Sequence, residues 1–197
     1  MLQSKQIVFF FLKALVIYGL LVLPLSFDTS YAKFYRVCGK QFFGKIQGKG
    51  FVMFNESKGK YDTRIIMGNY AQVLPNGKAA VVSRPLSVHY MGYMSTILLV
   101  SLVLATPIVW KRKLVSLIIG LVLLTLFIMF KQWIHLLFLN ISNPWLRLYQ
   151  FNDAQKTIIE YLYPKLADSL GTSWFVVVVI WLLISFRKDD LKMIIAD

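Results

Sequence analysis

The stretch 84–90, Arg-Pro-Leu-Ser-Val-His-Tyr, brings together side chains that are able to do chemistry. Arg84 can bind a phosphate or a carboxylate, and His89 can exchange a proton near neutral pH. Cys38 is the single cysteine and would be the nucleophile of a cysteine enzyme that used these groups. No spacing motif places Cys38 near His89. We therefore favour a non-catalytic interpretation, in which Arg84, His89 and Tyr90 contact a partner protein or lipid headgroups.

Known catalytic and metal-binding motifs are missing from the sequence. It contains no Gly-rich phosphate loop, no HExxH, no nucleophile elbow and no paired cysteines. One cysteine and two histidines, His89 and His135, are too few for a typical zinc site. The sequence therefore predicts no catalytic, cofactor-binding or metal-binding residue, and the absence of motifs counts against an enzyme without deciding the question.

The composition is typical of a membrane protein. Of 197 residues, 57% are hydrophobic and only 16% are charged. Lys and Arg exceed Asp and Glu by 13, which in a soluble protein would indicate nucleic acid. Here the cations must first be placed relative to a bilayer, so we expect membrane lipid and a multi-span membrane protein as partners, and no nucleic acid.

Four apolar stretches predict four transmembrane helices. A span needs roughly 20 apolar residues, and the candidates are 7–25, 90–109, 114–130 and 172–186. The joint 110–113, Trp-Lys-Arg-Lys, would make the second and third spans a hairpin. The predicted segments are span 1 (1–25), an exoplasmic domain (26–89), the hairpin (90–130), exoplasmic interfacial helices (131–171), and span 4 with a tail (172–197).

Basic residues set the predicted orientation. Lys5, the joint at 110–113, and Arg187, Lys188 and Lys192 would lie in the cytoplasm, together with both termini. The segments 26–89 and 131–171 would then be exoplasmic. An alternative for the N-terminus is a cleaved signal peptide, because Ser30-Tyr31-Ala32 has the small-x-small pattern of a cleavage site.

The segment 26–89 predicts a helix followed by a small sheet. Residues 28–46 repeat aromatic side chains at three- and four-residue intervals, with Lys33, Arg36 and Lys40 between them. Such a helix would pack on its own domain or lie on an anionic membrane surface, with Cys38 as a small buried hydrophobe. Short β-rich runs at 50–54, 63–67, 70–74 and 78–82 predict four antiparallel strands with a turn at 75–77.

The segment 131–171 predicts helices near the membrane surface. Trp133, Trp145 and Tyr149 are side chains that favour the interface. Pro144 after Asn143 is typical of a helix start, and Pro164 would kink or split the helix that follows.

The first 113 residues resemble the exosortase-associated small membrane proteins of Gram-negative bacteria. The shared layout is an N-terminal span ending in Leu-Pro, a Tyr-rich amphipathic segment, a small β region, Arg-Pro-Leu-Ser-x-x-Tyr (84–90), and a span ending Leu-Val-Leu-Ala-Thr-Pro (102–107). The resemblance implies an inner-membrane accessory protein beside an exosortase, a cysteine transpeptidase that processes sorting signals. It supplies no catalytic residues.

Three hypotheses follow from the sequence. The first is a non-enzymatic accessory subunit or scaffold that docks a membrane partner of the exosortase type. The second is a subunit of a lipid- or glycan-handling enzyme or transport complex that binds anionic headgroups through Lys33, Arg36, Lys40 and Arg84. The third is the cysteine transpeptidase itself, with Cys38 as its nucleophile.

Overall fold

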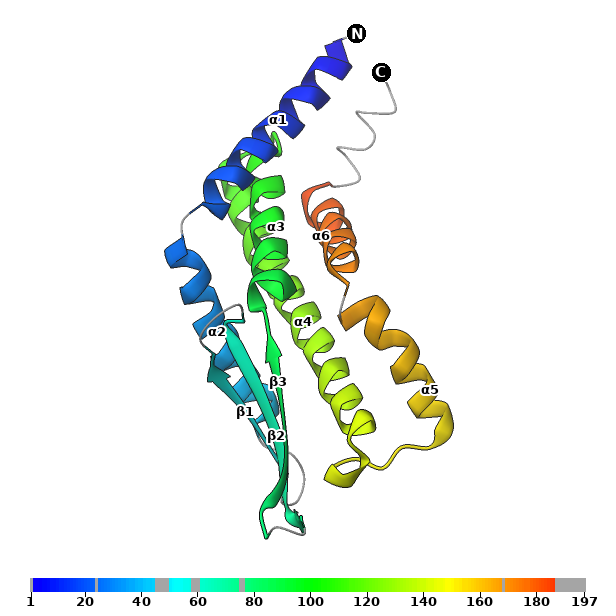
Figure 1. The fold of residues 1–197 in the computed structure, drawn as a ribbon. Helices are drawn as coiled ribbons and strands as arrows, with labels where there is room; N and C mark the ends of the chain where they lie inside the picture. Colours follow the sequence, from blue (N-terminus) through cyan, green and yellow to red (C-terminus); the bar gives the residue numbers. More distant parts are fainter. Residues whose placement is uncertain are drawn as a thin grey trace. The chain divides into compact units, whose positions relative to one another are not determined.

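A computed structural model describes residues 2–23, 25–44, 50–57, 61–74, 77–167 and 169–186. The chain divides into two compact units, each assembled from separate stretches of sequence. Unit 1 contains Met1–Leu25, Met94–Phe127 and Gly171–Asp197, and unit 2 contains Ser26–Tyr93 and Ile128–Leu170. Figure 1 shows the helices and strands of both.

Unit 1 is helical. It contains α1 (Leu2–Val22), α3 (Met94–Ala105), the first part of α4 (Trp110–Ser142), and α6 (Leu170–Ser185). Helix α1 packs along α3, where the Tyr18 hydroxyl donates to the sulfur of Met94 over 3.3 Å. The indole N–H of Trp181 on α6 donates to the Thr106 hydroxyl over 2.9 Å, just after α3. Polar contacts thus fix helices whose remaining surfaces are almost entirely apolar.

Cations at the start of α4 cap the ends of two other helices in unit 1. The Arg112 guanidinium donates to the carbonyl of Ser185 over 2.9 Å, at the C-terminus of α6. The Lys113 ammonium donates to the carbonyl of Leu104 over 2.8 Å, at the C-terminus of α3. The last carbonyls of a helix lack partners within it and carry partial negative charge, so these cations stabilise both ends.

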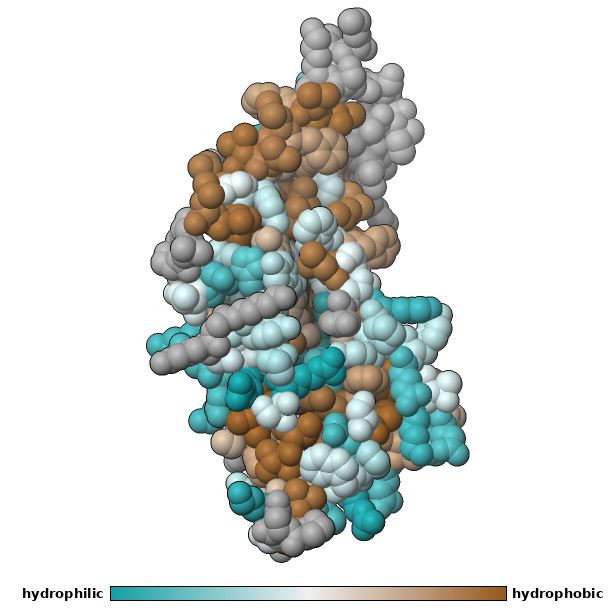
Figure 2. Space-filling model, in the orientation of Figure 1, coloured by the Kyte–Doolittle hydropathy of each residue, from teal (hydrophilic) through white to brown (hydrophobic). Residues whose placement is uncertain are grey.

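Unit 1 has large apolar side chains on its surface. Figure 2 shows hydrophobic residues gathered over α1. On the α4 part of the unit, the exposed large hydrophobic side chains are Trp110, Leu114, Val115, Ile118, Ile119, Val122, Leu123 and Leu126. Exposed apolar side chains that lie together in this way suit contact with lipid or protein.

Unit 2 is built on a three-stranded antiparallel sheet. Strands β1 (Gly50–Glu56), β2 (Thr63–Val73) and β3 (Ala79–Leu86) are paired in the order β1-β2-β3. Helix α2 (Leu25–Phe43) precedes the sheet and lies beside it in Figure 1. Three of the predicted strands are thereby confirmed, and so is the predicted helix at 28–46 as far as Phe43, where α2 ends. The fourth, 70–74, was wrong as a separate strand, because β2 continues through an irregular register between Asn69 and Val73.

The core of unit 2 lies between the sheet and the second part of α4. Ile65 and Met67 alternate on one face of β2 and are fully buried, with Leu136 and Leu139 of α4 in the same cluster. Period-two alternation gives the sheet one apolar face, and α4 covers it. Asn69, also on this face, donates to the Leu146 carbonyl over 2.9 Å and so joins the bulged strand to the chain after α4.

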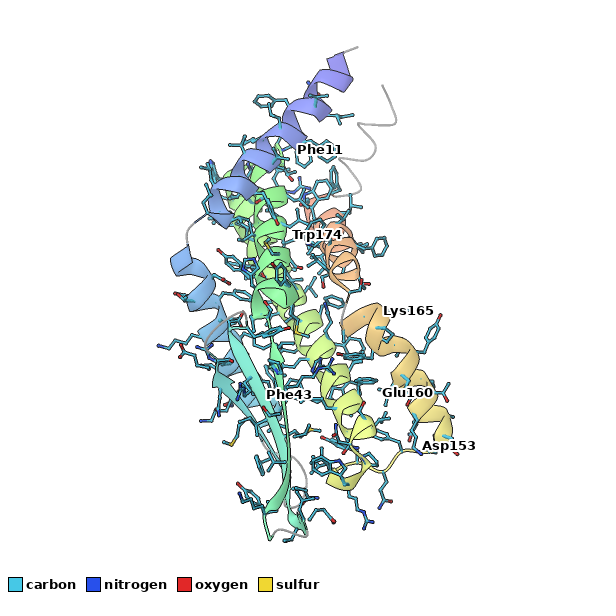
Figure 3. The ribbon with its side chains drawn as sticks, viewed as in Figure 1. Phe11, Phe43, Asp153, Glu160, Lys165 and Trp174 are labelled. Atoms are coloured by element: carbon cyan, nitrogen blue, oxygen red, sulfur yellow. The ribbon has the colours of Figure 1, made fainter. Side chains whose placement is uncertain are left out.

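The chain after α4 forms short helical pieces. Pro144–Leu146 is a 3₁₀ turn that begins with Pro144 after Asn143, as the sequence predicts, although it ends after one turn. Helix α5 (Asp153–Leu162) starts with a capping box, in which Asn152 and Gln155 exchange side-chain to backbone hydrogen bonds. A π-helical turn, Tyr163–Ala167, then includes Pro164. Figure 3 labels Asp153, Glu160 and Lys165 along this segment.

The predicted four-span membrane protein is wrong. Within the described residues, α4 alone is long and apolar enough to cross a membrane, and a second span results only if the bent pair Asp153–Ala167 and Leu170–Ser185 counts as one. The apolar helices Gln6–Val22 and His89–Ala105 are too short for the roughly 20 residues needed. The predicted joint at 110–113 is the first turn of α4, and the predicted interfacial residues 131–142 continue that helix.

Some predictions fall outside the described residues. Pro75 and Asn76 of the predicted turn, and Arg187, Lys188 and Lys192 of the predicted cytoplasmic tail, are among them. The cytoplasmic position of both termini was derived from four spans, and it stays a prediction.

Candidate functional site

Unit 2 contains a cavity of about 350 Å³, which is at the small end of ligand-binding pockets. The end of β3, the turn into α3, the second part of α4, and the π-helical turn after α5 all contribute to it. The lining residues are Tyr61, Arg84, Pro85, Leu86, Ser87, Tyr90, Met91, Lys131, His135, Tyr163, Ala167, Ser169 and Leu170. Two of the residues singled out from the sequence, Arg84 and Tyr90, are therefore at the cavity.

The register of the sheet aims Arg84 into unit 2. Arg84 on β3 is paired with Ile65 on β2, and directly paired residues point to the same face of an antiparallel sheet. Ile65 is fully buried against α4, so Arg84 also points to the α4 side. Its guanidinium carbon lies 5.5 Å from the centre of the Tyr163 ring, within the range of a cation–π contact.

Helix α4 adds two nitrogen-bearing side chains to the cavity. Lys131 is 1% exposed, and its ammonium lies 3.4 Å from the Ser169 carbonyl. His135 follows one turn later on the same face, is 4% exposed, and packs edge-on against Tyr163 at 5.4 Å between ring centres. Both residues come after the apolar stretch 114–130 of α4. The cavity therefore has a cation and an imidazole on one wall, with Arg84 contributed by the sheet.

His135 is held in its neutral form. Burial, with a smaller effect from the positive charge of Arg84, lowers the pKa of His135 from 6.5 to about 4. Its Nε2 atom is buried and has no hydrogen-bond partner within the described part of the chain. His135 is among the lining residues, so an unsatisfied polar atom lies beside the cavity.

Asp62 fixes the turn between β3 and α3, which contributes Ser87 and Tyr90 to the cavity lining. Its carboxylate accepts hydrogen bonds from the backbone N–H groups of Val88 over 3.1 Å and His89 over 3.2 Å. These N–H groups open the helical segment that begins at His89, so the carboxylate acts as its N-terminal cap. The Asp62 carbonyl also accepts from the Arg36 guanidinium over 3.2 Å. Ser87 and Tyr90, on either side of the capped peptides, are held at the cavity in this way.

His89 does not line the cavity, although the sequence groups it with Arg84. Its Nδ1 lies 3.1 Å from an oxygen of Asp28 on α2, and its ring packs against Tyr93 at 5.4 Å between centres. The other oxygen of Asp28 is buried. His89 therefore connects α2 to the turn before α3, which is a structural contact.

The three predicted cations of α2 also lie away from the cavity lining. Lys33 and Lys40 are exposed on α2, whereas Arg36 is half-buried and lies 3.9 Å from the Glu56 carboxylate on β1. Cys38 is half-buried, and burial raises the pKa of its thiol. A raised pKa leaves little thiolate at neutral pH, so the geometry does not favour Cys38 as a nucleophile.

Sequence reasoning missed Lys131, His135 and Tyr163. Lys131 and His135 are one turn apart in an apolar run, which is a signal that two polar side chains share a buried helix face. The face of the sheet to which Arg84 points was also predictable, because Ala80, Val82, Arg84 and Leu86 are alternate residues that share one face of β3. The contribution of Tyr163 follows from tertiary packing, and no local pattern indicates it.

The described residues contain no group of three or more His, Cys, Asp or Glu side chains arranged to hold a metal ion. Comparison with protein-family models, curated proteins and solved structures gives no match. The resemblance to exosortase-associated proteins therefore stays a prediction, as does the docking of an exosortase.

Proposed function

We propose that this chain is a membrane-associated binding subunit whose unit 2 cavity holds a phosphate group. The observation that carries the proposal is the composition of the cavity wall. Arg84 and Lys131 are both at the cavity, and no described lining residue is acidic. On the described part of the cavity wall, two cations and no acidic side chain favour an anionic ligand.

Phosphate fits the donors better than carboxylate does. The wall offers the guanidinium of Arg84, the ammonium of Lys131, and the hydroxyls of tyrosine and serine side chains. A phosphate group has more acceptor oxygens to satisfy such a set, and a planar guanidinium can bind two of them at once. Neutral His135 adds a partner without adding charge, because its pKa is about 4.

Membrane association is supported by the first part of α4. Its stretch 114–130 has no charged residue and is apolar except for Ser116 and Thr125, and eight of its 17 residues are exposed. At a rise of 1.5 Å per residue, a 33-residue helix is about 50 Å long, so it can cross the hydrocarbon and still contribute its last turns to a folded unit. A phosphate-bearing lipid headgroup and a free phosphate are then both possible sources of the ligand.

The test is a binding titration on the full chain in nanodiscs of phosphatidylcholine. Inorganic phosphate, dihexanoyl phosphatidic acid and dihexanoyl phosphatidylcholine are titrated separately by calorimetry. Binding of both phosphatidic acid and inorganic phosphate would identify a site for the free anion, and binding of phosphatidic acid alone would identify a headgroup site. Binding of none of the three would overturn the proposal.

Matched arginine variants locate the site. Arg84→Gln removes the guanidinium from the cavity, and we expect roughly 10- to 100-fold weaker binding because a hydrogen bond to a charged group is lost. Arg64→Gln is the control, because Arg64 is exposed on β2 next to Ile65 and so points to the opposite face. Equal losses for both variants would assign the binding to general surface charge and would contradict the proposal.

A further inference from the structure

The exposed surface of α2 is separate from the cavity and has an unusual composition. The helix packs into unit 2 through Ala32 and Tyr35, which are 3% and 1% exposed, and through Gly39. On its other side Phe34 is 50% and Val37 61% exposed, between the exposed Lys33 and Lys40. We call the set Lys33, Phe34, Val37 and Lys40 the α2 outer face.

Spacing puts these residues on one side of the helix. Lys33, Val37 and Lys40 follow one another at intervals of four and three residues, and Phe34 is three residues before Val37. The aromatic spacing of 28–46 predicted Phe34 and Tyr35 on one apolar face, whereas the structure buries Tyr35 and leaves Phe34 exposed. Phe42, 60% exposed at the end of α2, adds a second exposed aromatic ring.

The charge of this segment has a single sign. Between residues 33 and 49 the sequence has five cations, Lys33, Arg36, Lys40, Lys45 and Lys49, and no Asp or Glu. The acidic residue of α2, Asp28, is in its first turn and contacts His89. An exposed helix face that combines aromatic and aliphatic side chains with lysines is complementary to an anionic membrane surface, where the apolar groups enter the headgroup boundary and the ammoniums meet lipid phosphates.

We propose that the α2 outer face docks on an anionic bilayer surface. Phe34 and Val37 enter the interface, and Lys33 and Lys40 bind the phosphates of anionic lipids. The docking does not use Arg84 or the cavity, so it holds or fails independently of the proposed phosphate site.

The single cysteine makes a direct test possible. In a Cys38→Ser background, Val37→Cys places an environment-sensitive nitrobenzoxadiazole label on the α2 outer face. Val73→Cys is the matched control, because Val73 is a similarly exposed valine, 66% against 61%, in the sheet of the same unit. The full chain is placed in nanodiscs of phosphatidylcholine alone, or of phosphatidylcholine with about 30% phosphatidylglycerol, which gives the surface a negative potential.

We expect the label at position 37 to shift its emission to the blue and to lose iodide quenching only in the anionic discs. The label at position 73 should not respond. Lys33→Gln with Lys40→Gln should reduce the docked fraction, with the docked-to-undocked ratio falling roughly fivefold for each lysine removed. Arg64→Gln is the charge control, and Arg84→Gln should leave the shift intact.

Three outcomes would overturn the proposal. A label at position 37 that is equally accessible in both discs excludes docking, and shielding that is equal in both discs and insensitive to the lysines excludes anionic lipid as its cause. Shielding in detergent that grows with protein concentration would assign the α2 outer face to contact with a second copy of the chain. Loss of the shift in Arg84→Gln would contradict the independence of the two sites.

Discussion

The two parts of α4 have different surroundings, although they form one continuous helix. In the stretch 114–130 the buried residues are Ser116, Gly120, Leu124, Ile128 and Met129, which form a narrow stripe, and Ile118 is 64% exposed. In 131–140 every side chain is buried except Trp133 and Phe138. The apolar part is thus the exposed one, and the part with Lys131, Gln132, His135 and Asn140 is the buried one.

In most soluble proteins apolar side chains are buried and polar ones are exposed, and α4 reverses this pattern. The reversal indicates that its two parts suit different environments. An apolar helix that exposes nearly half of its residues is more stable where its environment is not water. A helix that buries polar side chains needs partners for them, and such residues are retained where they specify packing or bind a ligand. Hydropathy alone describes the first part of α4 well and says little about the second.

The largest expected effect concerns pH and His135. With a folded pKa of about 4 and an unfolded value of 6.5, the unfolded chain binds a proton that the folded chain does not. Folding stability is therefore full above pH 6.5, falls as the pH drops from 6.5 to 4, and loses about 3 kcal/mol in total, at 1.36 kcal/mol per pH unit. Chemical denaturation in detergent, followed by circular dichroism at each pH, measures this loss.

The control is His135→Leu, which removes the titrating group. We expect its stability to change less between pH 6.5 and pH 4 than that of the wild type, by the same amount of about 3 kcal/mol. The stretch 114–130 has no titratable residue, so it adds nothing to the dependence of folding stability on pH. Identical pH profiles for the two proteins would mean that His135 is solvated. The second part of α4 would then not be buried at this residue, which would contradict the contrast between the two parts.

The next largest effect concerns the contact of α2 with the buried part of α4. A methyl group at Gly39 would lie 2.9 Å from the amide nitrogen of Gln132 and 3.0 Å from the Phe54 ring. We expect Gly39→Ala to lower the free energy of unfolding by about 1–3 kcal/mol through overpacking. Gly19→Ala on α1 is the control, since nothing lies within 4 Å of the added group. It should be neutral or raise the stability by about 0.5–1 kcal/mol.

The smallest effect concerns Gln132 itself. Its side chain is fully buried, and neither amide atom has a hydrogen-bond partner among the residues that the structure describes. We expect Gln132→Met, of similar volume, to raise the free energy of unfolding by about 1 kcal/mol because a buried unsatisfied amide is removed. Thermal or chemical unfolding in detergent measures the gain.

Asn140→Leu is the matched change at a satisfied amide. Its side chain donates to the Tyr149 carbonyl over 3.0 Å and accepts from the Leu148 N–H over 3.3 Å. We expect a loss of about 1–3 kcal/mol, since two backbone groups lose their partners. If both variants shifted stability in the same direction, the packing of the polar residues on α4 would have to be revised.

The sequence was informative where one local pattern decided the outcome. The aromatic spacing of α2, the alternation along β2 and β3, and the Asn143-Pro144 start are local features, and the structure has all of them. No local pattern decided the number of membrane spans, because that number depends on where each helix begins and ends. The non-helical stretch Thr106–Val109 separates α3 from α4. The third span was expected to end before the charged residue Lys131, but α4 continues past it to Ser142.

The candidate site was predictable only in part. Arg84 and Tyr90 were recognised by their residue types, but their position at a shared cavity depends on the pairing of Arg84 with Ile65 and on the Asp62 cap. His89 was misplaced because its neighbour is Asp28, far away in the sequence. Such long-range contacts come from tertiary packing, which spacing along the chain does not encode.

The late position of α4 in the chain has a consequence for biosynthesis. Ile65 and Met67 of β2 are covered by Leu136 and Leu139, about 70 residues further along. At a synthesis rate of roughly 5–20 residues per second, about 3–14 s pass between the synthesis of β2 and that of the α4 residues that pack on its apolar face. During that interval the nascent sheet exposes both an apolar face and unpaired strand edges, the two features that recruit chaperones or promote aggregation.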